Sequence, residues 1–438
     1  MRIATILIVL AFACGPAATP AAAQLLDTLL PPGVPGYGTA PGVTVASRIR
    51  PGTEPLGVRA GAFVLQPLLQ QSLGYDDNVL GGSRKQGSAE VVTQPSLLLT
   101  SDWSRDGIGA FLAADDRRDL DAPAQSRTDW TASLGGDVEF DRDRLTLGVA
   151  HFRRHQDRTE LDALPSDRPV AFQVDDARAA YAWTSGRWTL TPALEASAWR
   201  FDPTSIVGVP ASQAYRDRDV LQGGVTLSYE LAPLRDLLLQ VRGIGQHYAH
   251  PSASQASENA TTAQFLAGFD YDDNALWRYR LLAGGERRSF AAAGLPAHTG
   301  AIAEAELAWS PTGLTTLTAT LTRRIEDAAQ EGVAGYTYTG ARLRVDHEYR
   351  RDLLLQASAG LQQADFLRSV APPTAALPGG GRQTGYTLGV GASWLVNRSL
   401  RLSLTYDLTG QHGGNTGAPA TSNDYTRSLA LVTVRLGL

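Results

Sequence analysis

The residue types that most often carry chemistry are few in this chain and widely spaced. Its 438 residues include one Cys and seven His, and the sequence holds no zinc-protease, serine-hydrolase or phosphate-loop motif. His151 and His155 share one face of an extended run, but about 13 Å of strand separates them, too far for one metal ion. His247 and His250 fall at the end of another run. We therefore expect these histidines to lie in water at the ends of strands. We expect no catalytic residue, metal site or bound cofactor.

The tetrapeptide Tyr-Asp-Asp-Asn, with two adjacent carboxylates, occurs twice, at Tyr75–Asn78 and Tyr271–Asn274. Clustered carboxylate oxygens could bind Ca²⁺, but Asp and Asn also form turns by bonding to their own backbone. The second copy falls at a short connection and the first at the far end of an extended run. The two copies therefore lie at opposite ends of the predicted strands and cannot share a site. We favour the turn interpretation.

Charged side chains also recur at every second position of several extended runs. Because successive side chains on a strand point to opposite faces, each such set lies on one face. That face could simply be the polar wall that a water-filled barrel needs, or it could be a charged conduit that guides an anionic or hydrated polymer. The sequence leaves both interpretations open. The lumen candidates are Arg278, Arg280, Glu286, Arg288, Arg342, Arg344, Asp346, Glu348, Arg401 and Asp407.

The elements that carry these side chains follow a period of two from Gly61 onward. In Leu400–Asp407, for example, Leu and Tyr alternate with Arg, Ser, Thr and Asp. A run of about 14 residues, tilted near 40°, crosses an apolar band of about 25 Å. The pattern predicts an all-β protein, a transmembrane antiparallel β-barrel of about eighteen strands, with sixteen or twenty as the alternatives. The runs lie near residues 61–74, 89–103, 107–117, 127–140, 144–156, 170–184, 187–201, 217–231, 237–249, 260–271, 276–290, 298–310, 314–326, 335–349, 353–367, 383–396, 400–412 and 424–438.

The connections between the runs alternate between short and long, as the periplasmic turns and outer loops of outer-membrane barrels do. Most Trp residues lie within a few residues of a short connection and share the parity of the apolar face. We interpret them as an aromatic girdle at the periplasmic interface, where an amphipathic ring has its apolar body in lipid and its polar tip in water. The girdle candidates are Trp103, Trp183, Trp188, Trp277, Trp309 and Trp394.

The N-terminal residues 1–23 predict a signal peptide, because Arg2 precedes a short apolar stretch and Ala21–Ala23 offers a cleavage site. Lipidation of Cys14 is the alternative; otherwise the mature chain has no Cys, and neither disulfides nor thiolate metal sites can form. Residues 24–60 are rich in Pro and Gly and predict an extended or disordered periplasmic leader. Residues 61–438 make up the predicted barrel.

The segment from Ser47 to Asn78 carries a resemblance to a known family. An Arg50–Pro51 pair leads into Gly61–Ala62–Phe63 and a strand that ends in Tyr75–Asn78. This sequence segment resembles the first strand of the outer-membrane β-barrel porins encoded with bacterial exopolysaccharide export systems, the β-barrel porin 2 type. The resemblance implies export of exopolysaccharide or a capsule-type polymer. A general or substrate-selective diffusion porin is the first alternative; an outer-membrane enzyme and a structural or adhesive surface protein are the others.

Composition and the predicted fold limit the partners and the location. The pI near 5.8 and the net charge of −5 argue against nucleic acid. A barrel implies outer-membrane lipid and the barrel assembly machinery as partners, in the outer membrane of a Gram-negative bacterium. The resemblance adds a secreted polysaccharide and periplasmic export proteins. The chain ends in Leu438 rather than the aromatic residue on which many outer-membrane barrels end.

Overall fold

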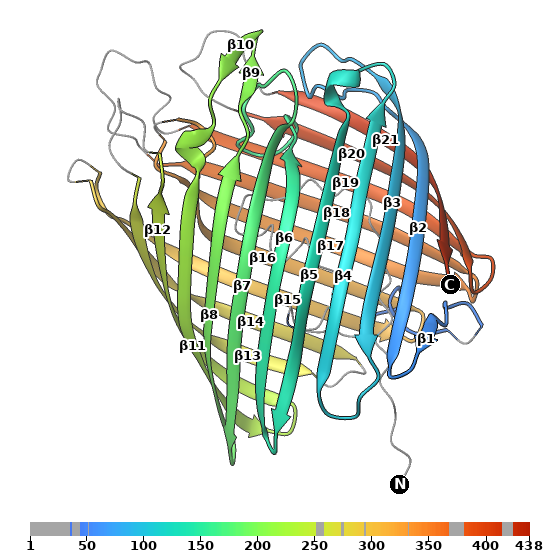
Figure 1. Ribbon diagram of the computed structural model, residues 1–438, viewed down its shortest axis with the longest axis vertical. Helices are drawn as coiled ribbons and strands as arrows, with labels where there is room; N and C mark the ends of the chain where they lie inside the picture. The colour runs from blue at the N-terminus through green and yellow to red at the C-terminus, as the bar shows by residue number, and fades with distance from the viewer. Residues whose placement is uncertain are drawn as a thin grey trace.

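The computed structural model of this protein describes residues 36, 44–50, 52–250, 258–272, 276–292, 295–331, 333–367, 381–413 and 424–438. The predicted signal peptide, Cys14 and most of the leader lie outside these residues. Within them, eighteen long antiparallel strands form one barrel (Figure 1). The strands are β2 (Phe63–Asp76), β3 (Ser88–Ser101), β4 (Gly107–Asp119), β5 (Arg127–Phe140), β6 (Asp143–Gln156), β7 (Val170–Ser185), β8 (Trp188–Phe201), β11 (Arg218–Ala232), β12 (Arg235–Tyr248), β13 (Ala260–Asp272), β14 (Trp277–Phe290), β15 (His298–Thr312), β16 (Thr315–Glu326), β17 (Tyr336–Arg350), β18 (Leu353–Phe366), β19 (Arg382–Leu395), β20 (Leu400–His412) and β21 (Tyr425–Gly437).

The barrel closes between its first and last long strands. β2 pairs with β3 on one side and with β21 on the other, and every other long strand pairs with its two neighbours along the chain. Closure leaves no long strand without a partner on either side, so the backbone of the wall is bonded from strand to strand, as a lipid environment requires. The eighteen-stranded barrel predicted from the sequence is therefore confirmed, and no predicted strand end differs from the observed one by more than two residues.

Alternation along each strand separates an outer face from a lumen face. On β20, Leu404 and Tyr406 are exposed on the outside, while Arg401 and Asp407 have the opposite parity. The register carries this division around the wall, since Leu404 lies opposite Ala392 on β19 and Val432 on β21. The outer face is thus a continuous apolar surface, and the polar side chains turn inward.

The two rims of the barrel differ, as Figure 1 shows, with tight turns at the lower end and long loops at the upper end. Some tight turns contain only two residues, and they use left-handed backbone: φ is 58° at Asp141 and 62° at Gly186. Three short elements lie in the loops, namely η1 (Pro123–Gln125), η2 (Ala214–Arg216) and the hairpin of β9 (Thr204–Ile206) with β10 (Val209–Ala211). A short strand, β1 (Val58–Ala60), pairs with β2 at the lower rim.

No helix within the described ranges is long and apolar enough to span a membrane.

Two clusters of buried apolar side chains are formed by the long strands alone. One cluster centres on Phe152, Val174 and Trp199, on β6, β7 and β8, all nearly or fully buried. The other surrounds Leu266 on β13, where Gly268 and Gly284 have no space for a side chain because a backbone carbonyl lies against each. These two clusters therefore place apolar side chains on parts of the inner face.

Candidate functional site: the lumen and its two mouths

The ten charged residues proposed as lumen-lining lie on three strands, and their parity is opposite to that of exposed apolar neighbours. On β14, Arg278 and Arg280 alternate with Trp277 and Leu281, both exposed on the outer face. The same holds for Arg342, Arg344, Asp346 and Glu348 on β17, where Leu343 is exposed, and for Arg401 and Asp407 on β20. Glu286 and Arg288 share the parity of Arg278 and Arg280 and are buried. All ten therefore lie on the face opposite the apolar exterior, and that they line a solute path stays a prediction.

Most of these charges have an opposite charge close by. Arg344 donates to Asp346 at 2.9 Å and to the side-chain oxygen of Gln356 at 3.0 Å. Arg280 lies opposite Asp270 and Glu306 in the register, and Arg278 is 3.5 Å from Asp272. Asp407 attracts Arg342 electrostatically. The lumen wall is therefore mixed in charge rather than purely cationic.

Two further candidates, Glu348 and Arg401, contact the N-terminal segment at the lower mouth. We call residues 44–57 of this segment, of which position 51 lies outside the described residues, the strap. Arg50 donates to Glu348 at 2.9 and 3.2 Å, and Arg48 donates to the same carboxylate. Both Arg50 and Glu348 are buried. One lumen carboxylate thus holds two guanidinium groups of the strap.

Other contacts fix the strap across the same mouth. Val45 is buried against Leu354 and Leu395 on the lumen side of β18 and β19, and its backbone N–H donates to the Thr316 hydroxyl at 3.0 Å. Further along, Glu54 lies 3.6 Å from Arg401. The sequence predicts an extended or disordered leader here. The described part instead lies against the wall, because its alternating charges meet complementary charges that are about 300 residues away in the chain.

At the upper mouth, the loop between β6 and β7 (residues 157–169) reaches the opposite wall. The hydroxyl of Tyr425 on β21 donates to the carbonyl of Thr159, and the backbone N–H of Asp162 donates to the Gln383 side chain on β19 at 2.8 Å. Leu161 is almost fully buried with Tyr336 and Tyr338 of β17. A loop that starts on one wall and bonds to the other narrows the entrance between them.

Asp162 joins this loop to the loop between β16 and β17. Its carboxylate accepts hydrogen bonds from the backbone N–H of Ala329 and, at 3.4 Å, from the Gln330 amide. Burial raises the pKa of Asp162 to about 7, although Ala329, Arg216 and Gln330 favour the charged form. The backbone φ at Asp162 is 61°, a left-handed conformation that Asp tolerates better than most residues.

Asp327, at the start of the same β16–β17 loop, holds that loop to β11, β12 and β14. Arg218 pairs with it at 3.0 Å, Arg288 pairs with its other oxygen, and the Gln246 amide donates at 2.9 Å. Burial opposes its charge, but Arg288 and Arg218 outweigh burial and keep the pKa of Asp327 below the ordinary Asp value. Tyr215 of η2 adds a hydrogen bond to the Ala329 carbonyl at 2.6 Å. Three loops therefore meet at one point.

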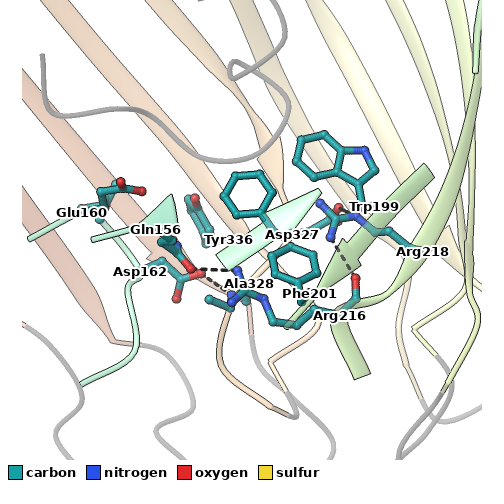
Figure 2. Close-up of a pocket in the computed structure, with 13 residues that line it drawn as sticks. Gln156, Glu160, Asp162, Trp199, Phe201, Arg216, Arg218, Asp327, Ala328 and Tyr336 are labelled. Atoms are coloured by element: carbon teal, nitrogen blue, oxygen red, sulfur yellow. Dashed lines mark hydrogen bonds and ion pairs between the residues drawn. The ribbon is translucent and has the colours of Figure 1, made fainter. Parts of the chain in front are cut away.

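A small cavity of about 30 Å³ lies at this meeting point, with room for about one water molecule. Figure 2 shows Arg216 and Arg218 beside the rings of Phe201 and Trp199, with Asp162 and Tyr336 nearby. The Arg216 guanidinium lies 4.0 Å from the Phe201 ring centre and donates to Gln156 at 2.9 Å. The loops are therefore packed against one another here, and cation–π and ionic interactions stabilise their contact.

The six girdle candidates lie at or next to the tight-turn rim. Trp103, Trp183, Trp188 and Trp394 are about half exposed, and Trp277 and Trp309 stack directly across β14 and β15 at 5.2 Å. Trp394 donates to Asp352 of the adjacent turn at 3.2 Å. Their contact with lipid stays a prediction.

The histidine and Tyr-Asp-Asp-Asn positions do not gather into a metal site. His151 pairs with Asp175 and His155 with Asp129, each at 2.7 Å. Asp76 pairs with Arg427 and also accepts from the Asn78 backbone at 2.8 Å, which is the local turn bond expected of Asp. No group of three or more metal-ligating side chains occurs among the described residues. Of the second copy, only Tyr271 and Asp272 lie within them.

Sequence patterns did not indicate the inward loops. Leu161, Asp162 and Asp327 lie in stretches without periodicity, and their partners are distant in the chain; Ala329, for example, is 167 residues beyond Asp162. The available signals were weak: a Leu in a polar loop, and a Tyr336–Tyr338 pair that occupies lumen positions at the strand end.

A closed barrel with an apolar exterior, a charged lumen and inward-folded mouths defines a porin-like channel of the outer membrane. The family described as "Putative beta-barrel porin 2" matches residues 50–437, and the chain belongs to this family. No curated protein matches the sequence.

Several solved structures resemble the barrel. The outer membrane protein OpdK from Pseudomonas aeruginosa shares 12% identity over 85% of this chain and 99% of its own, with a TM-score of 0.43. OccK2 (OpdF) from the same organism, solved in complex with glucuronate, shares 15% identity over 85% and 98%, with a TM-score of 0.44. OccAB2 from Acinetobacter baumannii shares 11% over 86% and 99%, with a TM-score of 0.44. These likenesses concern the fold.

Proposed function

We propose that this protein is a selective diffusion channel for small, charged, hydrated solutes, rather than an open general pore. One observation carries the proposal: both mouths are narrowed by segments of the chain itself, and each segment is held by ion pairs to lumen side chains. A solute that passes must exchange contacts with those charges. Weak, repeated contacts of this kind favour passage of charged solutes, because a solute has to leave each site as well as enter it.

The lumen charges support the same conclusion. Guanidinium forks on β14, β17 and β20 suit carboxylate or phosphate groups, and the carboxylates between them keep any single site weak. An open general pore would need neither the strap nor the three loops that meet at Asp162.

Liposome swelling with purified protein tests the proposal. Small charged solutes should enter faster than neutral sugars of equal size, and neutral oligosaccharides should enter slowly. A heat-denatured sample of the same preparation is the control for leakage. Equal entry of charged and neutral solutes, limited by size alone, would show an open general pore and refute the proposal.

Export of exopolysaccharide or a capsule-type polymer, which the resemblance of residues 47–78 implies, stays a prediction. A polymer in transit would need both mouths open at once, and no contact among the described residues favours a polymer over a small solute. Deletion of the gene separates the roles. Loss of secreted polymer with unchanged solute uptake would support export, whereas slower entry of small charged nutrients with intact polymer would support the selective channel.

A further inference from the structure

Two arginines face each other on the lumen wall at the lower mouth. Arg401 on β20 and Arg435 on β21 are directly opposite in the register and have the same parity. Like charges in this position repel unless an anion lies close to both. Each guanidinium offers a planar fork of donors, so two adjacent forks suit the oxygens of one carboxylate or phosphate group.

The anion that lies there belongs to the strap. The Glu54 carboxylate is 3.6 Å from Arg401, and both side chains are mostly buried. Arg435 also experiences the charge of Glu54. A separation of 3.6 Å is an ion pair without a short hydrogen bond, so a free oxyanion that bonds to both forks could replace it.

The backbone around Glu54 allows such a replacement. Glu54 lies between Gly52 (φ 92°) and Gly57 (φ 73°), and both positions are left-handed and suited to Gly. The strap is anchored independently on either side of this stretch, by Arg48 and Arg50 on Glu348 and by the Gly57 N–H to the Leu438 carbonyl at 2.9 Å. Glu54 can therefore leave Arg401 while the rest of the strap stays in place.

We propose that Arg401 and Arg435 form an oxyanion-binding site at the periplasmic mouth, and that Glu54 occupies this site as a tethered competitor for solutes with a carboxylate or phosphate group. The inference rests on the proposed function, because it gives the selective channel a specific site. A tethered carboxylate has a high effective concentration at the site. It weakens the binding of every free anion by the same factor. The residence time of a bound solute is therefore short, and the solute does not block the path.

Block of single-channel current in planar bilayers tests the site, with inorganic phosphate or acetate added on the periplasmic side. Glu54→Gln should strengthen block by phosphate about tenfold, because the competitor is lost. Acetate is tested in a separate series, because block by acetate shows whether one carboxylate group is enough for binding at the site. Glu54→Gln with Arg401→Gln and Arg435→Gln should abolish the gain. Arg401→Lys with Arg435→Lys in the Glu54→Gln background keeps the charge and should lose most of it, since Lys lacks the planar fork.

Asp102→Asn is the matched control, since Asp102 is a carboxylate at the same rim that pairs with the exposed Arg59 and not with Arg401 or Arg435, and its block should equal that of the wild type. If the channel conducts but Glu54→Gln leaves phosphate and acetate block unchanged, the oxyanion site is refuted while the channel stands. If no variant conducts at all, the proposed function itself fails. Should the triple variant not fold, phosphate titration of Glu54→Gln by calorimetry still decides, because absence of tighter binding than in the wild type overturns the proposal.

Discussion

Protonation of Asp162 should close the upper mouth. In the structure its carboxyl is buried between two loops, with a pKa of about 7 against 3.8 for an exposed Asp. If the loops separate, the carboxyl meets water and its pKa returns to the ordinary value. Closing therefore takes up a proton, and the closed arrangement gains stability that is fully present below pH 3.8 and lost as pH rises to about 7.

The size of this effect follows from the two pKa values. A difference of one pKa unit corresponds to about 1.4 kcal/mol, so the shift of Asp162 is worth up to about 4 kcal/mol between acid and alkaline conditions. Near the middle of the range, each pH unit should change the ratio of closed to open channels about tenfold. Arg216, Tyr215 and Tyr336 also face Asp162. Glu258, whose pKa burial raises to about 8, acts in the same direction.

Open probability in planar bilayers between pH 4.5 and 8 measures the effect. The wild type should open increasingly as pH rises. Asp162→Asn, which keeps the size but cannot ionise, should lose the part of the pH dependence that Asp162 supplies and keep only the part that Glu258 supplies; adding Glu258→Gln should remove that too. Asp167→Asn is the matched control, because Asp167 lies in the same loop, is only partly buried, and has a lowered pKa from backbone N–H donors at Gly208 and Val207. A pH dependence in Asp162→Asn as steep as in the wild type would refute the reasoning.

Two further predictions concern the wall. Leu404→Arg on the lipid-facing side of β20 should cost about 2–4 kcal/mol of folding free energy in lipid, whereas Thr405→Arg on the lumen side should cost much less; equal costs would contradict the face assignment. Replacing Arg278, Arg280, Arg342, Arg344 and Arg401 together by Gln should move the reversal potential in a KCl gradient toward cation preference, because Asp346, Glu348 and Asp407 remain. An unchanged reversal potential would show that these residues do not line the ion path.

The barrel could be predicted closely because its signal is local. Alternation between Leu and Thr or Arg along a strand such as β20 depends on lipid on one side and water on the other, and no distant residue is needed to detect it. The tight-turn rim followed for the same reason, since Asp141 and Gly186 mark turns by residue type. The charged lumen face could also be predicted, because side chains of one parity lie on one face of each strand.

The narrowing of the mouths could not be predicted, because it depends on pairs of residues far apart in the chain. The strap was expected to be extended or disordered, since Pro and Gly give no periodicity. Its position depends on Arg50 meeting Glu348, 298 residues later. The loop at Asp162 likewise depends on Gln383 and Ala329. The composition predicts that such segments lack regular structure. It does not predict which distant residues pair with their charges.

The two mouths lie along one path, and this arrangement has a measurable consequence. Resistances in series add, so opening one constriction changes the current little while the other stays closed. Arg48→Gln with Arg50→Gln should release the strap from Glu348. At pH 5, with the upper loops held by protonated Asp162, this variant should conduct almost like the wild type. At pH 8, with those loops free, it should conduct markedly more. Arg59→Gln is the matched control, because Arg59 lies at the same rim but pairs with Asp102 instead of Glu348. An increase by the same factor at both pH values would mean that the two constrictions do not lie on one path, and that ions pass one of them by another route.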